Sequence, residues 1–249
     1  MKSFNQFLIL FGVLMLLNSC RTVYTPNMHN VPLFKEKDEF RGTFGFNDFQ
    51  LAYSPISHLG LMMNAQYHNG GSYSEPFEDG SARKYLIEGG IGYYRNFERS
   101  GVFELYGGGG YGGVSFDHSS DSEFSAYNSK LSRFFIQPSI GFTSEFFDLS
   151  FSMRFIRLNY FDHDISEYEP GSVFDEDYDL RELNDHIYTF LEPGITLRAG
   201  WNQVKFHMQF VRTLQLNDLS LNHRRGIVNI GVHVNFASRY SIEKEENKQ

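Results

Sequence analysis

Nine ionisable side chains recur at alternate positions of apolar runs, and they are the residues of this chain best placed for chemistry. In each run one parity is apolar, while the other parity carries an acid, a base or a histidine. These side chains are Glu88, Glu104, Glu145, Arg154, Glu192, Arg198, Lys205, His207 and His233. Residues of one parity share one face of a β-strand, so we expect the nine to project from a common surface.

The role of these charged side chains depends on where their common surface lies in the fold. Inside a small closed barrel, side chains fill the lumen and buried charges must pair. We therefore predict a polar network that plugs the lumen, formed by Glu88, Glu104, Arg154, Glu192, Lys205, His207 and His233. The alternative is a narrow path for small solutes, although open aqueous channels are typical of barrels with about 16 strands or more.

An acidic stretch lies between residues 162 and 185. Asp175, Asp177 and Asp179 have the alternate spacing of a calcium-binding loop. However, Leu180 stands where such a loop needs glycine, and His186 stands where it needs the bidentate glutamate. We expect a solvated acidic loop, with a site for a divalent ion or a partner as the alternative, and no defined metal site.

His118, Ser119, Ser120 and Asp121 are the residue types of a hydrolytic or acyl-transfer site. Adjacency in sequence is not the geometry of a catalytic triad, and polar loops often contain these residues. We therefore predict no enzymatic activity and no cofactor. A lipid-modifying enzyme of the outer membrane is the least favoured alternative.

The elements that carry these residues are indicated by a period of two that persists from Glu39 to Phe236. The runs are about 11 to 15 residues long, whereas strands of soluble proteins average about 5 to 6. Short connections alternate with long polar ones, which are expected at residues 69–82, 116–130, 160–186 and 213–225. This pattern favours an all-β, antiparallel, up-and-down transmembrane β-barrel over a soluble sandwich or lipocalin-like barrel.

The number of strands depends on the segment 39–54. Eight runs lie between Leu59 and Phe236, and the segment adds either one bulged strand or a hairpin. Its apolar parity slips at Asn47-Asp48, which a two-residue hairpin turn would cause. The best prediction is ten strands, with eight or nine as the alternatives.

The N-terminus has the pattern of an export signal. Lys2 precedes an apolar run, Phe7 to Leu17, that is too short to span a bilayer. The run ends in Leu17-Asn18-Ser19-Cys20, which resembles the lipobox of bacterial lipoproteins and implies acylation of Cys20, the single cysteine. The expected organisation is a signal peptide (1–19), a lipidated extended tether (20–38), the barrel (39–237) and a polar tail (238–249).

Residues 39–236 resemble the superfamily of small bacterial outer-membrane β-barrels, the OmpA-like and OmpX-like group. The resemblance rests on the strand pattern, on the turn segment Tyr53–Leu61 and on the final strand, Gly226–Phe236 (GIVNIGVHVNF). That strand is similar to the signal by which the barrel-insertion machinery recognises its substrates, although a tail follows it here. The resemblance implies location in the outer membrane, with the lipid and that machinery as partners, and no particular chemistry.

Composition excludes other classes. The formal net charge of −8 provides no footprint for nucleic acid, and the mean hydropathy of −0.37 does not suit a helical membrane protein. We therefore predict a non-enzymatic outer-membrane β-barrel lipoprotein with a plugged lumen. Its polar extracellular loops would serve structural, adhesion or partner-binding roles, with another envelope protein or a surface polymer as the partner.

Overall fold

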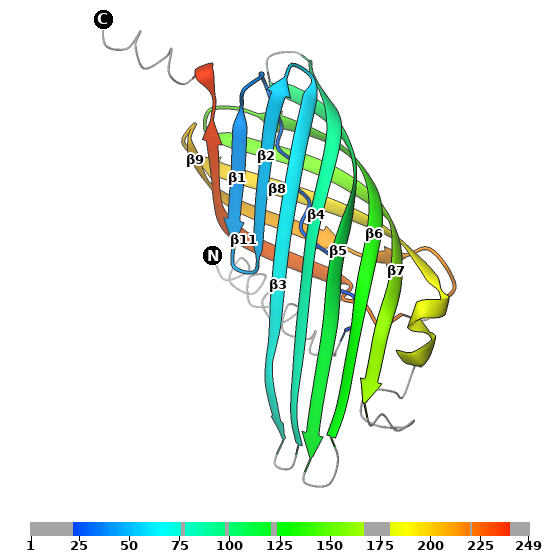
Figure 1. Cartoon of the computed structure of the whole chain (residues 1–249). Helices are drawn as coiled ribbons and strands as arrows, with labels where there is room; N and C mark the ends of the chain where they lie inside the picture. The colour runs from blue at the N-terminus through cyan, green and yellow to red at the C-terminus, as the bar shows by residue number, and fades with distance from the viewer. Residues whose placement is uncertain are drawn as a thin grey trace, which may run out of the picture.

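In the computed structural model the chain forms a closed antiparallel β-barrel (Figure 1). The structure describes residues 22–75, 78–97, 100–120, 124–166, 180–219 and 221–239. The strands are β1 (Phe40–Gly45), β2 (Asp48–Ile56), β3 (Leu59–Glu75), β4 (Glu78–Phe97), β5 (Gly101–Ser120), β6 (Phe124–Thr143), β7 (Phe147–Ser166), β8 (Ile187–Gly200), β9 (Val204–Arg212), β10 (Leu214–Gln215) and β11 (Gly226–Phe236). Because β9 and β10 both pair with β8 and are separated only by Thr213, they form one strand of the barrel. The predicted ten-stranded barrel is confirmed.

The barrel closes where its last strand meets its first. β11 pairs with β1 from Phe40↔Phe236 to Gly45↔Gly231, and its other edge pairs with β9. The change of parity predicted near residue 47 is a hairpin, since β1 and β2 pair around residues 46–47. This hairpin makes the strand number even and places the start of β1 at the same end of the barrel as the end of β11.

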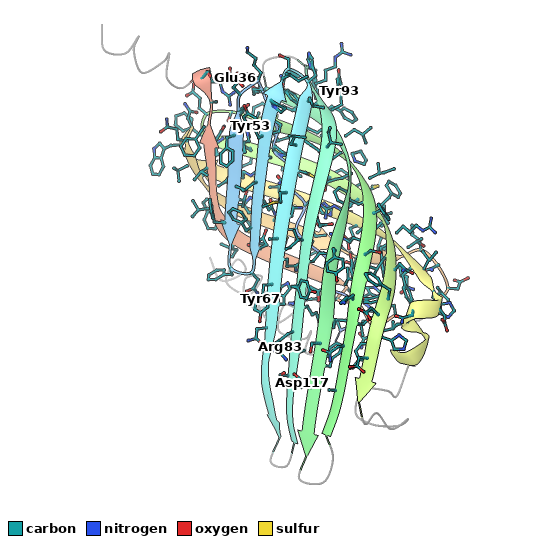
Figure 2. The ribbon with its side chains drawn as sticks, in the orientation of Figure 1. Glu36, Tyr53, Tyr67, Arg83, Tyr93 and Asp117 are labelled. Atoms are coloured by element: carbon teal, nitrogen blue, oxygen red, sulfur yellow. The ribbon has the colours of Figure 1, made fainter. Side chains whose placement is uncertain are left out.

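The outer surface carries an apolar band. Outward side chains of β3, β4 and β5 are exposed and apolar up to Tyr67, Tyr85 and Tyr111. Beyond these tyrosines the outward positions become polar: Arg83 and Asp117 follow on β4 and β5, as Figure 2 shows. At the other edge the band ends in exposed aromatic rings, namely Phe97, Phe142, Phe146, Phe147, Trp201 and Phe236. Apolar outer bands flanked by aromatic girdles are typical of transmembrane barrels.

Four strands are much longer than the band. β4, β5, β6 and β7 each have 20 residues, about 65 Å of extended chain, whereas the hydrocarbon core is about 30 Å thick. The loops predicted at residues 69–82 and 116–130 are therefore wrong in large part: both segments continue the ladders β3–β4 and β5–β6. Beyond the band the apolar parity changes from the outer to the inner face, where Val114, Phe116 and Tyr127 are buried, so the pattern of the band ends while the hydrogen-bonded ladder continues.

The two ends of the barrel differ. We call the end with the connections 57–58, 98–100, 144–146 and 201–203 the turn rim, and the opposite end the loop rim. A short 3-10 helix, η1 (Leu180–Asp185), and residues 216–225 lie at the loop rim. None of the helices in the described ranges is long and apolar enough to cross a bilayer.

Glycines on the inner face let neighbouring strands approach closely. A Cβ atom at Gly108 would lie 2.2 Å from the carbonyl oxygen of Gly89 and 2.8 Å from the Cα of Gly90, both backbone atoms. At the adjacent, outward-facing Gly107 the nearest atom would be 3.9 Å away. The inner position therefore excludes side chains, whereas the outer one tolerates them.

We expect Gly108→Val to destabilise the folded barrel by about 1–3 kcal/mol or more, because the clashing backbone cannot move aside. Gly107→Val is the matched control and should leave stability nearly unchanged. The measurement is the temperature at which the purified barrel loses its compact, fast-migrating form on gels. Equal midpoints for the two variants would contradict the packing described for this face.

Candidate functional site

The segment expected to be a tether lies inside the barrel. Residues 22–36, here called the lumen segment, run through the lumen in a largely extended conformation that is interrupted at Leu33, where φ is 58°; Asn27, His29, Val31, Leu33 and Phe34 are all buried. The extended conformation agrees with the sequence, but the position does not correspond to a tether outside the barrel. No pattern in residues 22–36 predicts this position, because a segment that is surrounded by a polar wall has no periodicity.

Side chains of the barrel wall form hydrogen bonds with the backbone polar groups of the lumen segment. The backbone N–H of His29 donates to Gln209 Oε1, and Gln209 Nε2 donates back to the His29 carbonyl, both at 2.8 Å. Gln137 Nε2 donates to the Asn30 carbonyl and Arg198 Nη2 to the Val31 carbonyl, again at 2.8 Å. A buried backbone requires such partners, so these contacts compensate for its lost hydration.

Glycines of the wall make room for the lumen segment. A Cβ atom at Gly194 would lie 2.8 Å from Nδ1 of His29, and one at Gly141 would lie 2.7 Å from Cδ2 of Leu33. Ser152, another small residue, binds His29 Nδ1 through its Oγ at 2.7 Å. The inner surface thus follows the shape of this segment.

The segment enters at the loop rim and leaves at the turn rim. At its start, Lys84 Nζ donates to Thr22 Oγ1 at 3.0 Å, and the Val23 N–H donates to the carbonyl of Asn222 at 2.8 Å. At its end, Asn96 Nδ2, one residue before the end of β4, donates to the Lys35 carbonyl at 2.8 Å. The chain therefore traverses the barrel from one end to the other.

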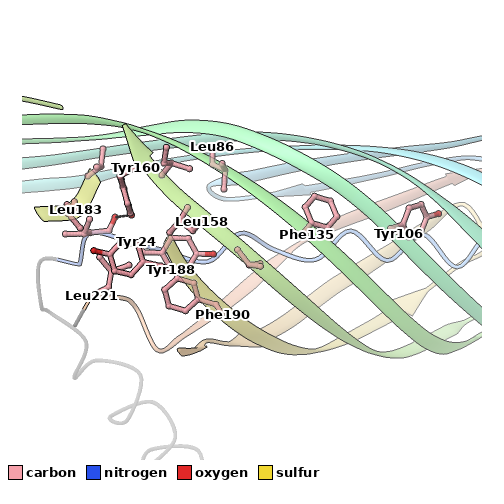
Figure 3. Close-up of a cluster of buried hydrophobic side chains, with 14 of the residues drawn as sticks. Tyr24, Leu86, Tyr106, Phe135, Leu158, Tyr160, Leu183, Tyr188, Phe190 and Leu221 are labelled. Atoms are coloured by element: carbon pink, nitrogen blue, oxygen red, sulfur yellow. Dashed lines mark hydrogen bonds between the residues drawn. The ribbon is translucent and has the colours of Figure 1, made fainter. Parts of the chain in front are cut away.

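An apolar cluster surrounds the entrance (Figure 3). Tyr24 stacks on Phe190 with ring centroids 4.8 Å apart. Side chains from β4 to β8, from η1 and from the loop residue Leu221 pack around them: Leu86, Val114, Leu131, Leu158, Tyr160, Leu183, Tyr188 and Leu221. The cluster closes over the first residues of the lumen segment.

The middle of the lumen is held by ionic contacts centred on Glu88. Its carboxylate accepts from Arg133 Nε and from Arg154 Nη1, the latter at 3.2 Å. Asn27 of the lumen segment donates to the same carboxylate at 2.6 Å. Arg154 also donates through Nε and Nη2 to Gln137 Oε1, at 2.9 and 2.6 Å. Glu88 therefore joins two arginines of the wall to the lumen segment.

A second contact ties Tyr24 into this network. The Tyr24 hydroxyl donates to Glu192 Oε1 at 2.8 Å and accepts from Arg133 Nη1 at 2.6 Å. The other carboxylate oxygen of Glu192 lies 3.8 Å from Nε2 of His29. Each of the two carboxylates in the middle of the lumen, Glu88 and Glu192, therefore accepts a hydrogen bond from a side chain of the lumen segment.

Nearer the turn rim the charges centre on Asp148. Lys205 Nζ and Thr143 Oγ1 each donate to Asp148 Oδ1 at 2.6 Å, and Arg198 Nη1 lies 3.9 Å from Oδ2. Arg198 Nε lies 3.3 Å from Nδ1 of His207. This cluster holds the Val31 carbonyl through Arg198, so it also fixes the lumen segment.

The structure places the predicted lumen residues on the inner wall, and it separates them. Glu88, Glu104, Arg154, Glu192, Lys205, His207 and His233 are all buried. Glu104 lies apart from the two clusters, where it accepts from the N–H of Phe34 at 3.3 Å, and His233 Nδ1 is 2.9 Å from Thr43 Oγ1. Glu145, expected in the lumen, is exposed in the turn after β6 because its strand ends at Thr143.

Sequence reasoning missed several partners. Arg133, Gln137, Asp148 and Gln209 are buried on the inner wall but are not among the predicted lumen residues. Their inward parity could have revealed them, whereas nothing marked the lumen segment. Cys20, for which acylation is predicted, the acidic residues Asp175, Asp177 and Asp179, and Asp121 lie outside the described residues. The backbone of His118 to Ser120 belongs to β5.

The lumen segment is clamped where it leaves the barrel. The Glu39 carboxylate accepts from the N–H of Lys35 at 2.8 Å, from Arg41 Nε at 2.8 Å and from Arg239 Nη2 at 2.8 Å. Burial raises the pKa of Glu39, but the Arg41 and Arg239 guanidinium groups outweigh it and lower the pKa from 4.5 to about 2. Glu36 lies at this rim and contacts Arg239 at 3.5 Å (Figure 2).

A polar cavity of about 140 Å³ lies beside the β1–β2 hairpin. Met28 of the lumen segment forms part of its lining, together with Asp48, His68, Arg224 and Asn229. Its volume would accommodate several water molecules. The cavity lies between the lumen segment and the wall, next to the loop rim.

These features define the class of the molecule. Apolar side chains face outward between aromatic edges, and polar side chains face inward, on ten antiparallel strands. The chain is a β-barrel of the outer-membrane type.

Comparison with known proteins adds a likeness of fold. The barrel is similar to the translocator domain of the autotransporter NalP from Neisseria meningitidis, with 10% sequence identity and a TM-score of 0.44, over 80% of this chain and 76% of that chain. No protein-family model matches the chain, and no curated protein is significantly similar to it. A likeness of this size carries no information about function.

We expect Glu88→Gln to destabilise the barrel by about 3–5 kcal/mol, because it removes the carboxylate that the buried Arg133 and Arg154 contact. Asp117→Asn is the control: it breaks the exposed Asp117–Arg83 pair and should cost less than about 1 kcal/mol. Urea unfolding of the reconstituted barrel measures both. A loss for Glu88→Gln no larger than that of the control would refute the network.

We expect the Glu39 clamp to weaken in acid. Since the folded-state pKa of Glu39, about 2, is below its ordinary value of 4.5, its contribution is complete above pH 4.5 and disappears as the pH falls to about 2. Glu39→Gln should therefore be less stable than the wild type at neutral pH, and the difference should vanish near pH 2. A difference that is constant across this range, measured by urea unfolding, would be inconsistent with the clamp.

Proposed function

We propose that this protein is a non-enzymatic lipoprotein of the bacterial outer membrane whose barrel is closed by its own N-terminal segment. The observation that carries the proposal is the burial of residues 22–36 in the lumen by hydrogen bonds from the wall. Location in the membrane is supported by the apolar outer band, and acylation is supported by the lipobox-like sequence before Cys20.

A filled lumen argues against a transport role. The buried charged groups of the described residues are nearly balanced: five cations and six carboxylates. The cations are Arg41, Arg133, Arg154, Arg198 and Lys205, and the carboxylates are Glu39, Asp48, Glu88, Glu104, Asp148 and Glu192. Most of them contact one another or the lumen segment, so they are engaged in structure and do not form a ring that would select a passing ion.

The working surface is then the loop rim. On one side of the barrel the long strands carry it well beyond the apolar band, where outward polar side chains such as Arg83 are available to an envelope protein or a surface polymer. Strand β11, Gly226–Phe236, pairs with β1 at the closing seam of the barrel, which suits recognition by the insertion machinery before closure. In this proposal the protein acts through the surface that it displays at the loop rim and through its attachment to the membrane.

We expect purified wild-type protein in planar bilayers to show no steady current, because the lumen segment fills the barrel. Deletion of residues 22–34 should produce stable open channels, since it removes the backbone that the wall binds. Deletion of residues 240–249 from the C-terminal tail is the control and should remain silent.

Steady open currents from the wild-type protein would overturn the closed barrel and favour the narrow solute channel. This outcome needs no variant, so it decides between the two functions even if the deletion fails to fold.

A further inference from the structure

The direction in which the lumen segment runs determines the side on which the chain begins. Thr22, its first described residue, lies at the loop rim, where it contacts Lys84 and is adjacent to the Val23–Asn222 contact. Lys37 is exposed just after the segment leaves at the turn rim. The chain therefore crosses the thickness of the barrel before its first strand begins.

The level of Thr22 coincides with the outer edge of the apolar band. Lys84, its partner, precedes Tyr85, the last outward aromatic residue of the band on β4. On the side of the β1–β2 hairpin the wall ends at the same edge, because the N–H of Tyr67 donates to the carbonyl of Asn47, in the hairpin turn. A group attached just before Thr22 therefore lies level with the membrane–water interface, on the side where the barrel wall ends at the β1–β2 hairpin.

We infer that the mature N-terminus emerges on the outer face of the membrane and that the acyl chains on Cys20 insert into the outer leaflet. Outer-membrane barrels place short turns in the periplasm and long connections outside, so the loop rim faces outward. Cys20 precedes Thr22 by two residues, a reach of at most about 7 Å. This inference rests on the proposed lipoprotein character and adds the leaflet and the route.

The packing of the lumen also constrains assembly. Asn27, His29 and Phe34 are completely buried, and wall side chains contact them from several strands. An acylated N-terminus cannot be drawn through a lumen filled in this way after closure. The segment is therefore enclosed while the barrel is still open, and pairing of β11 with β1 completes the enclosure.

Thiol labelling of intact cells tests the inference. Three single variants of the full-length protein receive a membrane-impermeant maleimide before and after permeabilisation of the outer membrane: Thr22→Cys, Asn222→Cys and Lys37→Cys. Asn222 and Lys37 are exposed and mark the loop rim and the turn rim. The wild type is the control, since acylation leaves Cys20 without a free thiol, and mass spectrometry of its N-terminal peptide checks the acyl chains.

We expect Thr22→Cys and Asn222→Cys to be labelled equally in intact and permeabilised cells, and labelling of Lys37→Cys to be lost in intact cells. Labelling of Thr22→Cys that follows Lys37→Cys would overturn the threading. Labelling of Lys37→Cys alone in intact cells would overturn the orientation and, with it, the outer-leaflet anchor.

An N-terminal peptide without acyl chains would refute the lipoprotein proposal, while the labelling pattern would still report the route of the chain. The two failures are therefore distinguishable. Because all three substitutions lie at the rims, heat-dependent gel migration serves to confirm that each variant is folded before it is labelled.

Discussion

An extended backbone buried in a narrow barrel must find a partner for each of its polar groups, and much of this structure follows from that constraint. The lumen segment has neither a helix nor a strand ladder to satisfy its N–H and C=O groups. The wall supplies amide and guanidinium side chains instead, with Gln209 as a two-way partner of His29. The same requirement explains why long polar side chains face inward, and why glycine and serine are found where the segment approaches the wall most closely.

The charges of the lumen are best understood as part of this arrangement. Glu88 binds two wall arginines and Asn27 of the lumen segment, and Glu192 accepts from Thr213 of the wall and from Tyr24 of the lumen segment, so each carboxylate joins the two parts of the molecule. Buried ion pairs contribute little stability when compared with an apolar core, but loss of one partner is costly. Such a network specifies one path for the segment, because a shift along the lumen would break contacts at Glu88, Glu192 and Arg198 together.

The sequence predicted the parts of the fold that depend on the membrane. Alternation of apolar and polar residues requires an apolar solvent on one side, so the strands within the band, the hairpin at residue 47 and the inward parity of Glu88 and Arg154 could all be predicted. The loop-rim ends of β5 and β6 could not, because there the apolar parity changes to the inner face, where Phe116 and Tyr127 are buried. The lumen segment could not either: Asn27, His29 and Asn30 are typical of a polar loop, and only the three-dimensional wall makes them interior residues.

Hydrogen–deuterium exchange of the folded, membrane-reconstituted protein tests the central claim most directly. If residues 22–36 are threaded through the lumen, backbone amides such as those of His29 and Phe34 should exchange as slowly as those of the barrel strands, because wall side chains hold them away from water. The backbone amide of the exposed residue Lys37 should exchange much faster. Exchange of the whole 22–36 segment at the rate of an unstructured peptide would contradict the account.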